Sequence, residues 1–202
     1  MNRELILNGF TVSDDSDCFV IAEIGHNHQG DLETAKKMFK TAKELGANAV
    51  KLQKRDNKSL FTKEIYYAPY TSENAYAPTY GEHRNALEFG RDEYSELCKY
   101  AKELDITFFA TAFDFNSADF LAEFEMPLYK IASGDLKNIP LLKYIAQIGK
   151  PMILSTGGGS IDDVKRAYDE VMPINQQLCI LQCTAVCITV EPKDMNLRVI
   201  ET

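Results

Sequence analysis

Short apolar runs alternate along the chain with segments in which apolar residues recur at helical spacing. Between residues 32 and 45, for example, Leu32, Ala35, Met38 and Phe39 fall three or four positions apart, which is typical of an amphipathic helix. The short runs are predicted to form buried strands over residues 19–22, 48–53, 106–110, 128–131, 151–154 and 178–183. Strands that alternate with helices predict an α/β protein with a parallel sheet and right-handed crossovers.

Polar residues follow each predicted strand instead of gathering at one point. Two architectures fit an alternating pattern, a doubly wound sheet and a barrel, and a ring of polar strand ends favours the barrel. We therefore expect a parallel (β/α)8 TIM-type barrel. Because a complete barrel takes ~250 residues and the chain has 202, the barrel should be incomplete, with about six βα units present.

The first residues form a pattern of their own. Residues 1–18 alternate weakly around Gly9 and predict a short N-terminal hairpin. The expected division is therefore an N-terminal extension over residues 1–18 and one partial barrel domain over residues 19–202. In that domain Asp31 is predicted to cap the first helix and Gly46 to end it. The long connection over residues 54–90 is rich in tyrosine, and loops of this length are usually functional.

Composition and charge exclude several classes of function. The net charge of −8 argues against nucleic-acid or anionic-membrane partners, because the overall field repels polyanions. No apolar run approaches the ~18 residues that a membrane span needs, and the first residues lack the layout of a signal peptide. Five cysteines without framework spacing indicate a reducing compartment. We expect a cytoplasmic protein.

Two lysines fall within predicted buried strands. An unpaired lysine is costly there, so Lys51 and Lys130 must each find a carboxylate, such as Glu23 or Asp135, or bind an anion. Ser155 precedes three glycines at the start of a predicted helix, where free N–H groups can cradle a phosphate. Two such lysines at one predicted rim of a negatively charged protein favour an anionic, phosphorylated substrate.

The histidine and cysteine spacings do not predict a metal site. His26 and His28 lie one residue apart and could share a metal, but two ligands do not make a site, and no metal ligand is predicted. Cys179, Cys183 and Cys187 share a four-residue spacing that matches no trusted metal motif, so they are expected to pack as small hydrophobic residues.

Several segments carry a family resemblance, in one order and over nearly the whole chain. They are IAEIGHNHQGD at 21–31, VKLQ at 50–53, YGEHR at 80–84, LEF at 87–89, YKIASGD at 129–135, LSTGG at 154–158, LQCTA at 181–185 and DMNLRVIE at 194–201. With these segments the chain resembles the sialic acid (N-acetylneuraminate) synthase family, whose catalytic domain is a (β/α)8 barrel. The resemblance implies an N-terminal part of that domain, truncated on its C-terminal side.

The resemblance implies a reaction and the residues that carry it. Phosphoenolpyruvate condenses with an N-acetylated aldehyde sugar, such as N-acetylmannosamine, to give a sialic acid-type nonulosonate and phosphate. The implied catalytic residues are Glu23, Lys51 and Gln53, with Glu23 as the candidate for proton transfer. The implied substrate-binding residues are Thr111, Lys130, Ser133, Asp135 and Ser155. The tyrosine-bearing connection would cover the sugar.

The resemblance also implies a divalent metal, Mn²⁺ or Mg²⁺, whose histidine ligands are expected beyond Thr202, and a homodimer for the full-length protein. One segment departs from the family, because the chain reads Val186-Cys187-Ile188-Thr189 where an aromatic–proline pair is usual. We expect little or no synthase activity from this chain alone.

Two other functions stay open. A Schiff-base aldolase or lyase of the TIM-barrel class would use Lys130 or Lys51 as its nucleophile. A truncated, non-catalytic product would fold poorly or bind a partner. Borohydride trapping of a substrate would favour the aldolase, and release of phosphate from phosphoenolpyruvate would favour the synthase.

Overall fold

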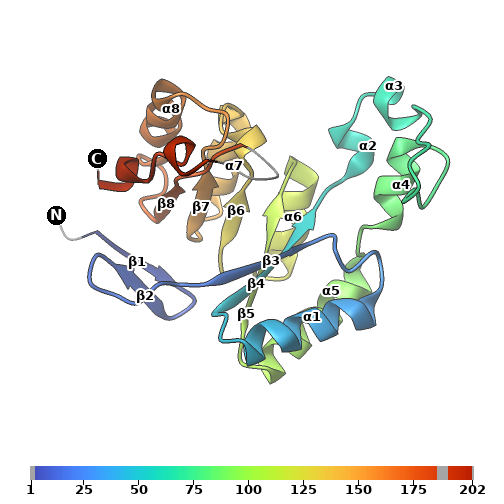
Figure 1. Cartoon of the computed structure of the whole chain (residues 1–202), viewed down its shortest axis with the longest axis horizontal. Helices are drawn as coiled ribbons and strands as arrows, with labels where there is room; N and C mark the ends of the chain where they lie inside the picture. The colour runs from blue at the N-terminus through green and yellow to red at the C-terminus, as the bar shows by residue number, and fades with distance from the viewer. Residues whose placement is uncertain (1–2, 186–190, 202) are drawn as a thin grey trace. The chain divides into compact units, whose positions relative to one another are not determined.

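The computed structural model describes residues 3–185 and 191–201. It is an α/β structure in which parallel strands alternate with helices, as the sequence predicts (Figure 1). The chain divides into two compact units, and each is described by itself: Asp17–Pro127, and Met1–Ser16 together with Leu128–Thr202. The predicted assignment of residues 19–202 to one domain stays a prediction.

The unit Asp17–Pro127 contains three parallel strands, β3 (Ile21–Gly25), β4 (Ala49–Lys54) and β5 (Thr107–Ala112). Their bounds differ from the predicted ones by a few residues at either end. The pairing of β3 with β4 is irregular between Glu23 and Gly25. A bulge of this kind redirects side chains at the end of a strand.

Helices α1 (Leu32–Glu44) and α5 (Arg91–Glu103) lie side by side in this unit (Figure 1). The side chain of Asp31 accepts a hydrogen bond from the Thr34 N–H at 2.6 Å, which confirms the predicted cap. Phe39 of α1 and Tyr94 of α5 both contact Phe108 of β5, with ring centroids 5.0 and 5.7 Å apart. These buried rings form the core between helices and sheet.

The long connection contains three short helices, α2 (Asn57–Leu60), α3 (Lys63–Tyr66) and α4 (Tyr80–Ala86), labelled in Figure 1. Asn85 Nδ2 donates a hydrogen bond to the Tyr66 hydroxyl at 2.6 Å. A Cβ on Gly81 would meet the Tyr66 ring at 2.3 Å, so α3 and α4 approach closely only because residue 81 is glycine. Helix α6 (Phe115–Glu123) follows β5 and is capped by Asp114.

The second unit contains the parallel strands β6 (Tyr129–Ile131), β7 (Met152–Ser155) and β8 (Leu178–Leu181). A 3₁₀ turn, η1 (Ser133–Asp135), follows β6. Helices α7 (Ile139–Gln147) and α8 (Ile161–Val171) pack against each other. The spacing of Ser160 and Asp163 predicts a capping box at the start of α8, and the structure confirms it.

The N-terminal hairpin is confirmed as β1 (Glu4–Leu7) paired antiparallel with β2 (Phe10–Ser13). Its turn residues, Asn8 and Gly9, both have positive φ, as a tight two-residue hairpin turn requires. The sequence also predicts a helix from Met195 onward, and this prediction is wrong. Two 3₁₀ turns stand there, η2 (Pro192–Asp194) and η3 (Leu197–Glu201), because Asn196 between them adopts a φ of 48° that no α-helix contains.

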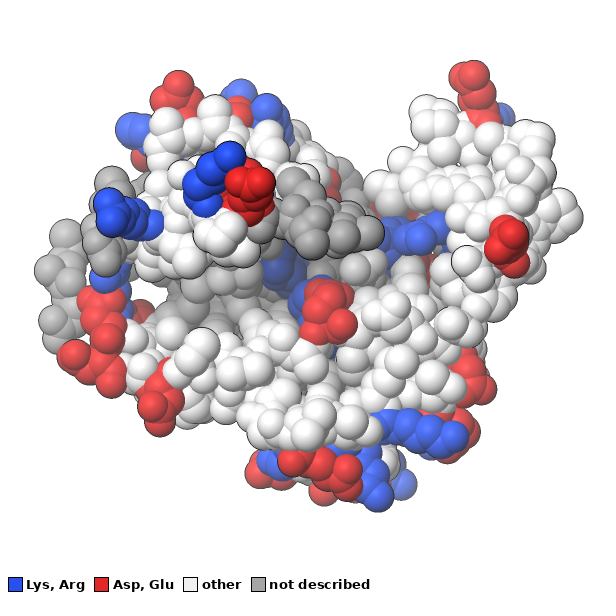
Figure 2. All heavy atoms as spheres, viewed as in Figure 1, with Lys and Arg blue, Asp and Glu red and all other residues white. Residues whose placement is uncertain are grey.

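Charged side chains of both signs are interspersed on the face shown in Figure 2. Lys36 of α1, for example, pairs with Glu33 of its own helix and with Glu96 of α5. Among the described residues, no helix is both long enough and apolar enough to cross a bilayer.

Candidate functional site

Lys51 lies in the middle of β4 and is 4% exposed. Its ammonium group donates to Thr111 Oγ1 at 2.6 Å and forms an ion pair with Glu23, which confirms the predicted alternative of a carboxylate partner. Burial lowers the pKa of Lys51, and the charge of Glu23 offsets part of that shift. The Glu23 side chain is 51% exposed, so the carboxylate is the member of the pair that solvent and ligands can reach.

Gln53 extends this group along the same face of β4. Gln53 Nε2 donates to Glu23 Oε1 at 3.5 Å, and Gln53 Oε1 accepts a hydrogen bond from Arg55 at 2.6 Å. A Cβ on Gly25 would lie 3.2 Å from Glu23 Oε1 and 3.3 Å from Gln53 Nε2. Residue 25 also has a φ of 57°, so glycine is what allows these two side chains to meet.

Lys130 occupies the matching position on β6 of the second unit. It is buried, and its ammonium group donates to Ser155 Oγ and, at 2.6 Å, to the Ile131 carbonyl. Ser133, at the start of η1, accepts a hydrogen bond from the Gly157 N–H at 3.0 Å. The structure thus brings together Lys130, Ser133 and Ser155 around the end of β7.

The two lysine–hydroxyl pairs share one geometry. Lys51 is in register with Phe109, and Thr111 lies two residues beyond that partner. Lys130 is in register with Ile153, and Ser155 again lies two residues beyond. Because residues two apart on a strand share a face, each hydroxyl reaches its lysine from the neighbouring strand.

The glycine turn after β7 forms hydrogen bonds with neighbouring parts of the same unit. The Gly157 N–H bonds to Ser133, the Gly159 N–H to the Thr156 carbonyl at 3.1 Å, and Thr156 Oγ1 donates to the Leu181 carbonyl of β8 at 2.8 Å. Its predicted use as a phosphate cradle stays a prediction. Asp135 accepts a hydrogen bond from Asn138 Nδ2 at 3.3 Å.

Both candidate histidines have structural partners. His28 is 1% exposed, stacks on Phe89 with centroids 4.0 Å apart, and accepts the Gly30 N–H at its Nδ1. His26 Nε2 lies 3.1 Å from Glu88 Oε1, within ion-pair distance but not aligned as a hydrogen bond. Cys179 is half-buried on β8, and burial raises its pKa. Cys187, like the departure at Val186-Cys187-Ile188-Thr189, lies outside the described residues.

Acidification should destabilise the protein through His28. Burial, aided by nearby His26, lowers the pKa of His28 to about 4 from 6.5. The unfolded chain therefore binds the proton first, so this contribution to stability is complete above pH 6.5 and is lost as the pH falls toward 4. We expect His28→Gln to reduce the difference in unfolding free energy between pH 7 and pH 4.5 by about 2 kcal/mol, measured by urea denaturation. An unchanged difference would contradict this prediction.

Sequence reasoning missed a charged cluster formed by His26, Arg55, Arg84 and Glu88, here called the His26 cluster. Arg55 Nη1 and Arg84 Nη2 lie 3.3 and 3.4 Å from His26 Nδ1, and the Arg55 guanidinium stacks on Phe113 at 3.7 Å from its centroid. The residues come from three separate segments, so no local spacing in the sequence predicts the cluster. His26, Arg84 and Glu88 each lie in a segment that carries the family resemblance, and Arg55 lies in none of them.

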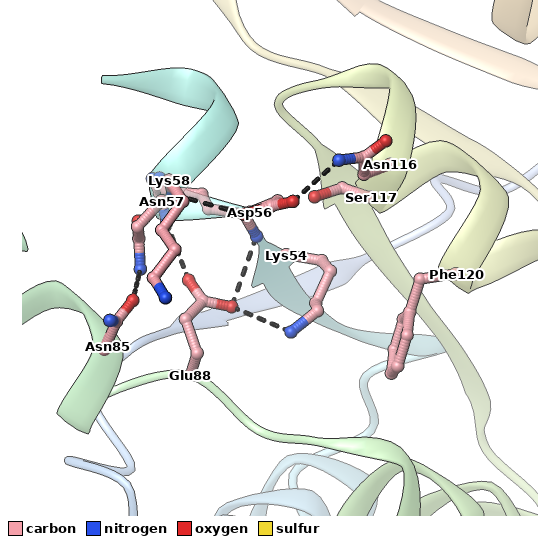
Figure 3. A pocket seen from close by; sticks show the side chains of 10 residues that line it. Lys54, Asp56, Asn57, Lys58, Asn85, Glu88, Asn116, Ser117 and Phe120 are labelled. Carbon is pink, nitrogen blue, oxygen red and sulfur yellow. Dashed lines mark hydrogen bonds and ion pairs between the residues drawn. The ribbon is translucent and has the colours of Figure 1, made fainter. Parts of the chain in front are cut away.

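A pocket of about 390 Å³ lies beside this cluster in the unit Asp17–Pro127 (Figure 3). Several of its charged groups have polar partners. Lys54 lies 3.3 Å from Glu88 Oε2, and Asn116 donates to Asp56 Oδ2 at 2.7 Å. Phe120 faces Lys54, whose ammonium group is 4.7 Å from the ring centroid. The lining carries the cationic side chains of Lys54, Arg55 and Lys58 and the carboxylates of Asp56 and Glu88.

Comparison with known sequences finds one family. The NeuB family matches residues 38–202. The chain is 46% identical over 183 residues to the N-acetylneuraminate-9-phosphate synthase of Mus musculus, which covers 91% of this chain and 51% of the relative. It is 37% identical over 191 residues to the N,N'-diacetyllegionaminic acid synthase of Legionella pneumophila, covering 92% of this chain and 53% of the relative. The chain spans about half the length of these relatives.

Comparison with solved structures agrees with the sequence comparison. An N-acetylneuraminic acid synthetase from Leptospira borgpetersenii, solved in complex with citrate, matches with a TM-score of 0.84 at 30% identity, covering 100% of this chain and 66% of that one. A truncated 3-deoxy-D-arabino-heptulosonate 7-phosphate synthase from Thermotoga maritima matches with a TM-score of 0.68 at 12% identity, covering 99% of this chain and 64% of that one. The second likeness concerns the fold alone. Together they bear out the predicted incomplete barrel.

Proposed function

The chain belongs to the NeuB family, and on that premise we propose that it carries the phosphoenolpyruvate-binding part of a sialic acid-type synthase. The observation that supports this most is the repeated lysine–hydroxyl pair. Each buried ammonium group, Lys51 and Lys130, presents a positive charge beside a hydroxyl donor at the end of a parallel strand. Phosphoenolpyruvate carries a phosphate and a carboxylate, and we assign one lysine pair to an anionic group of this substrate.

The proposed roles follow from the chemistry of each group. Each unit offers one candidate anion-binding group, Lys51 with Thr111 in the first and Lys130 with Ser133 and Ser155 in the second. An incoming anion displaces the half-exposed Glu23 from Lys51 and frees its carboxylate to exchange a proton. Gln53, held by Arg55, orients that carboxylate. Asp135 belongs to the substrate-binding set by its position in the motif.

The proposed reaction is a condensation followed by hydration and loss of phosphate. The methylene carbon of phosphoenolpyruvate forms a bond with the aldehyde carbon of the N-acetylated sugar, and the aldehyde oxygen takes up a proton. Water adds to the enol carbon and gives up a proton. The hydroxyl group formed from water then becomes the carbonyl of the product as the bond between that carbon and the phosphate oxygen breaks, and inorganic phosphate leaves with the hydroxyl proton. Glu23 is the proposed group for one of these proton transfers.

The metal implied by the family resemblance does not fit the residues described here. Among residues 3–185 and 191–201, no group of three or more histidine, cysteine or acidic side chains is arranged to hold an ion. No step is therefore assigned to a metal held by these residues. The homodimer of the full-length protein and its cytoplasmic location remain proposals.

Two measurements on one preparation distinguish the proposed synthase function from the competing aldolase function. We expect borohydride with pyruvate or sugar to leave no covalent adduct on Lys51 or Lys130, because neither lysine acts as a Schiff-base nucleophile in the synthase reaction. Calorimetric titration should show saturable binding of phosphoenolpyruvate, with little or no phosphate release from the chain alone when N-acetylmannosamine is added. A borohydride adduct at either lysine, found by peptide mass spectrometry, would refute the synthase function.

A further inference from the structure

Glu88 is a buried carboxylate that contacts residue 55 at two places. Its side chain is 9% exposed, its Oε2 accepts the backbone N–H of Arg55 at 3.2 Å, and its Oε1 lies 4.0 Å from Arg55 Nη1. The same carboxylate lies 3.1 Å from His26 Nε2 and 3.3 Å from Lys54 Nζ. Burial opposes ionisation, but the contacts with His26 and Lys54 outweigh it, so the pKa of Glu88 is lowered. Glu88 is therefore ionised at neutral pH.

The guanidinium group of Arg55 is held by three neighbours. It stacks on Phe113 at 3.7 Å from the ring centroid, which restrains its plane. Its Nη1 lies beside Glu88 and 3.3 Å from His26 Nδ1. Because the N–H groups of arginine point in fixed directions, these contacts direct Nη2 to Gln53 Oε1, which is 2.6 Å away.

The side-chain amide of Gln53 takes its orientation from Arg55. The two ends of an amide are nearly alike in shape, but arginine only donates hydrogen bonds, so Gln53 turns its oxygen to Arg55. The NH2 group then faces Glu23 Oε1 at 3.5 Å, and an added Cβ on Gly25 would lie 3.3 Å from Nε2. The reversed amide would set NH2 against a guanidinium group and oxygen against a carboxylate.

Glu88 acts on this amide from the other face of β4. Lys54 follows Gln53 on the strand, so the two side chains point to opposite faces, and Glu88 pairs with Lys54. We propose that Glu88 is a positioning residue of the proposed synthase site: through Arg55 it turns the NH2 group of Gln53 toward the substrate. The inference rests on the proposed function, in which the substrate anion displaces Glu23. A donor that is fixed before the substrate arrives costs no reorganisation on binding.

Nuclear magnetic resonance on the whole chain observes this amide directly. In the wild type we expect Nε2 of Gln53, identified as the signal lost in Gln53→Glu, to be as rigid as the backbone. Its protons should show a nuclear Overhauser effect to the Gly25 Hα protons. In Glu88→Gln that contact should disappear, and phosphoenolpyruvate should bind about fivefold more weakly, as for one lost hydrogen bond. Arg55→Lys, which keeps the charge but removes Nη2, should have both effects.

Glu103→Gln is the matched control, because the Glu103 side chain on α5 is 57% exposed and pairs loosely with Lys99 at 3.8 Å. It should change neither the amide signal nor the affinity. Urea denaturation of each variant separates positioning from folding. A Glu88→Gln protein that is less stable but keeps the contact with Gly25 overturns the proposal, and so does a wild type without that contact. If Glu88→Gln does not fold, Glu88→Asp, which keeps the charge but shortens its reach, is judged by the same two results.

The outcomes separate this inference from the proposed function. If Glu88→Gln loses the amide orientation but phosphoenolpyruvate binds neither protein, Glu88 still positions the amide and the synthase function is refuted. If phosphoenolpyruvate binds and the amide keeps its orientation in Glu88→Gln, the positioning role is overturned and the proposed function stands. A loosened amide with an unchanged affinity for phosphoenolpyruvate also overturns the proposal, because Gln53 then does not serve that substrate.

Discussion

Lys51→Met should weaken the binding of phosphoenolpyruvate by on the order of 100-fold, because it removes a buried charge that contacts the substrate. Met fills nearly the same volume without the cost of burying an ammonium group, so the free energy of unfolding should stay the same or rise. Glu23 loses its ion-pair partner, but its half-exposed side chain remains hydrated. Calorimetric titration and urea denaturation measure the two effects separately.

Lys99→Met is the matched control for this substitution. Lys99 lies on α5 with its side chain 79% exposed and pairs loosely with Glu103 at 3.8 Å. Its loss should leave phosphoenolpyruvate affinity unchanged, since exposed ion pairs contribute little. Equal affinities of the Lys51 and Lys99 variants would show that Lys51 does not bind the substrate.

Gly30→Ala should destabilise the unit Asp17–Pro127 by about 3 kcal/mol or more. A Cβ at residue 30 would stand 2.4 Å from the Ala86 carbonyl oxygen at the end of α4, and a backbone atom cannot move aside cheaply. Residue 30 also has a φ of 78°, which a side chain disfavours. Urea denaturation measures the loss, and reduced phosphoenolpyruvate binding should accompany it.

Gly46→Ala separates the clash from the backbone strain. Residue 46 has a φ of 86°, but a Cβ there meets nothing within 4 Å. Only the strain remains, so we expect a loss of about 1 kcal/mol. If the two variants lose the same stability, the contact between residue 30 and Ala86 is not what constrains this loop.

The sequence predicted what local patterns encode. The strands carrying Lys51 and Lys130, the cap of α1 at Asp31 and the capping box at Ser160 are all present, because each depends on neighbouring residues or on a short apolar run. Helices α2 to α4 escaped prediction because one or two turns are too short to display a period. Their positions depend on distant contacts, such as Asn85 with Tyr66.

The candidate site likewise has one part that local sequence patterns predict and one part that depends on distant contacts. Lys51 and Gln53 share a strand face, so their proximity follows from alternation along β4. The His26 cluster could not be predicted from spacing, since Arg55, Arg84 and Glu88 meet His26 only after the segment 54–90 has folded. The predicted helix from Met195 failed at a single residue, Asn196, whose positive φ the apolar spacing does not reveal.

The lysine–hydroxyl pair needs only two neighbouring parallel strands, with the hydroxyl two residues past the register partner of the lysine. Such a pair can therefore be transferred to another parallel sheet. A designer who places lysine and threonine at these two positions on an unrelated parallel scaffold should obtain a preorganised anchor for small organic acids, without copying any loop from this protein.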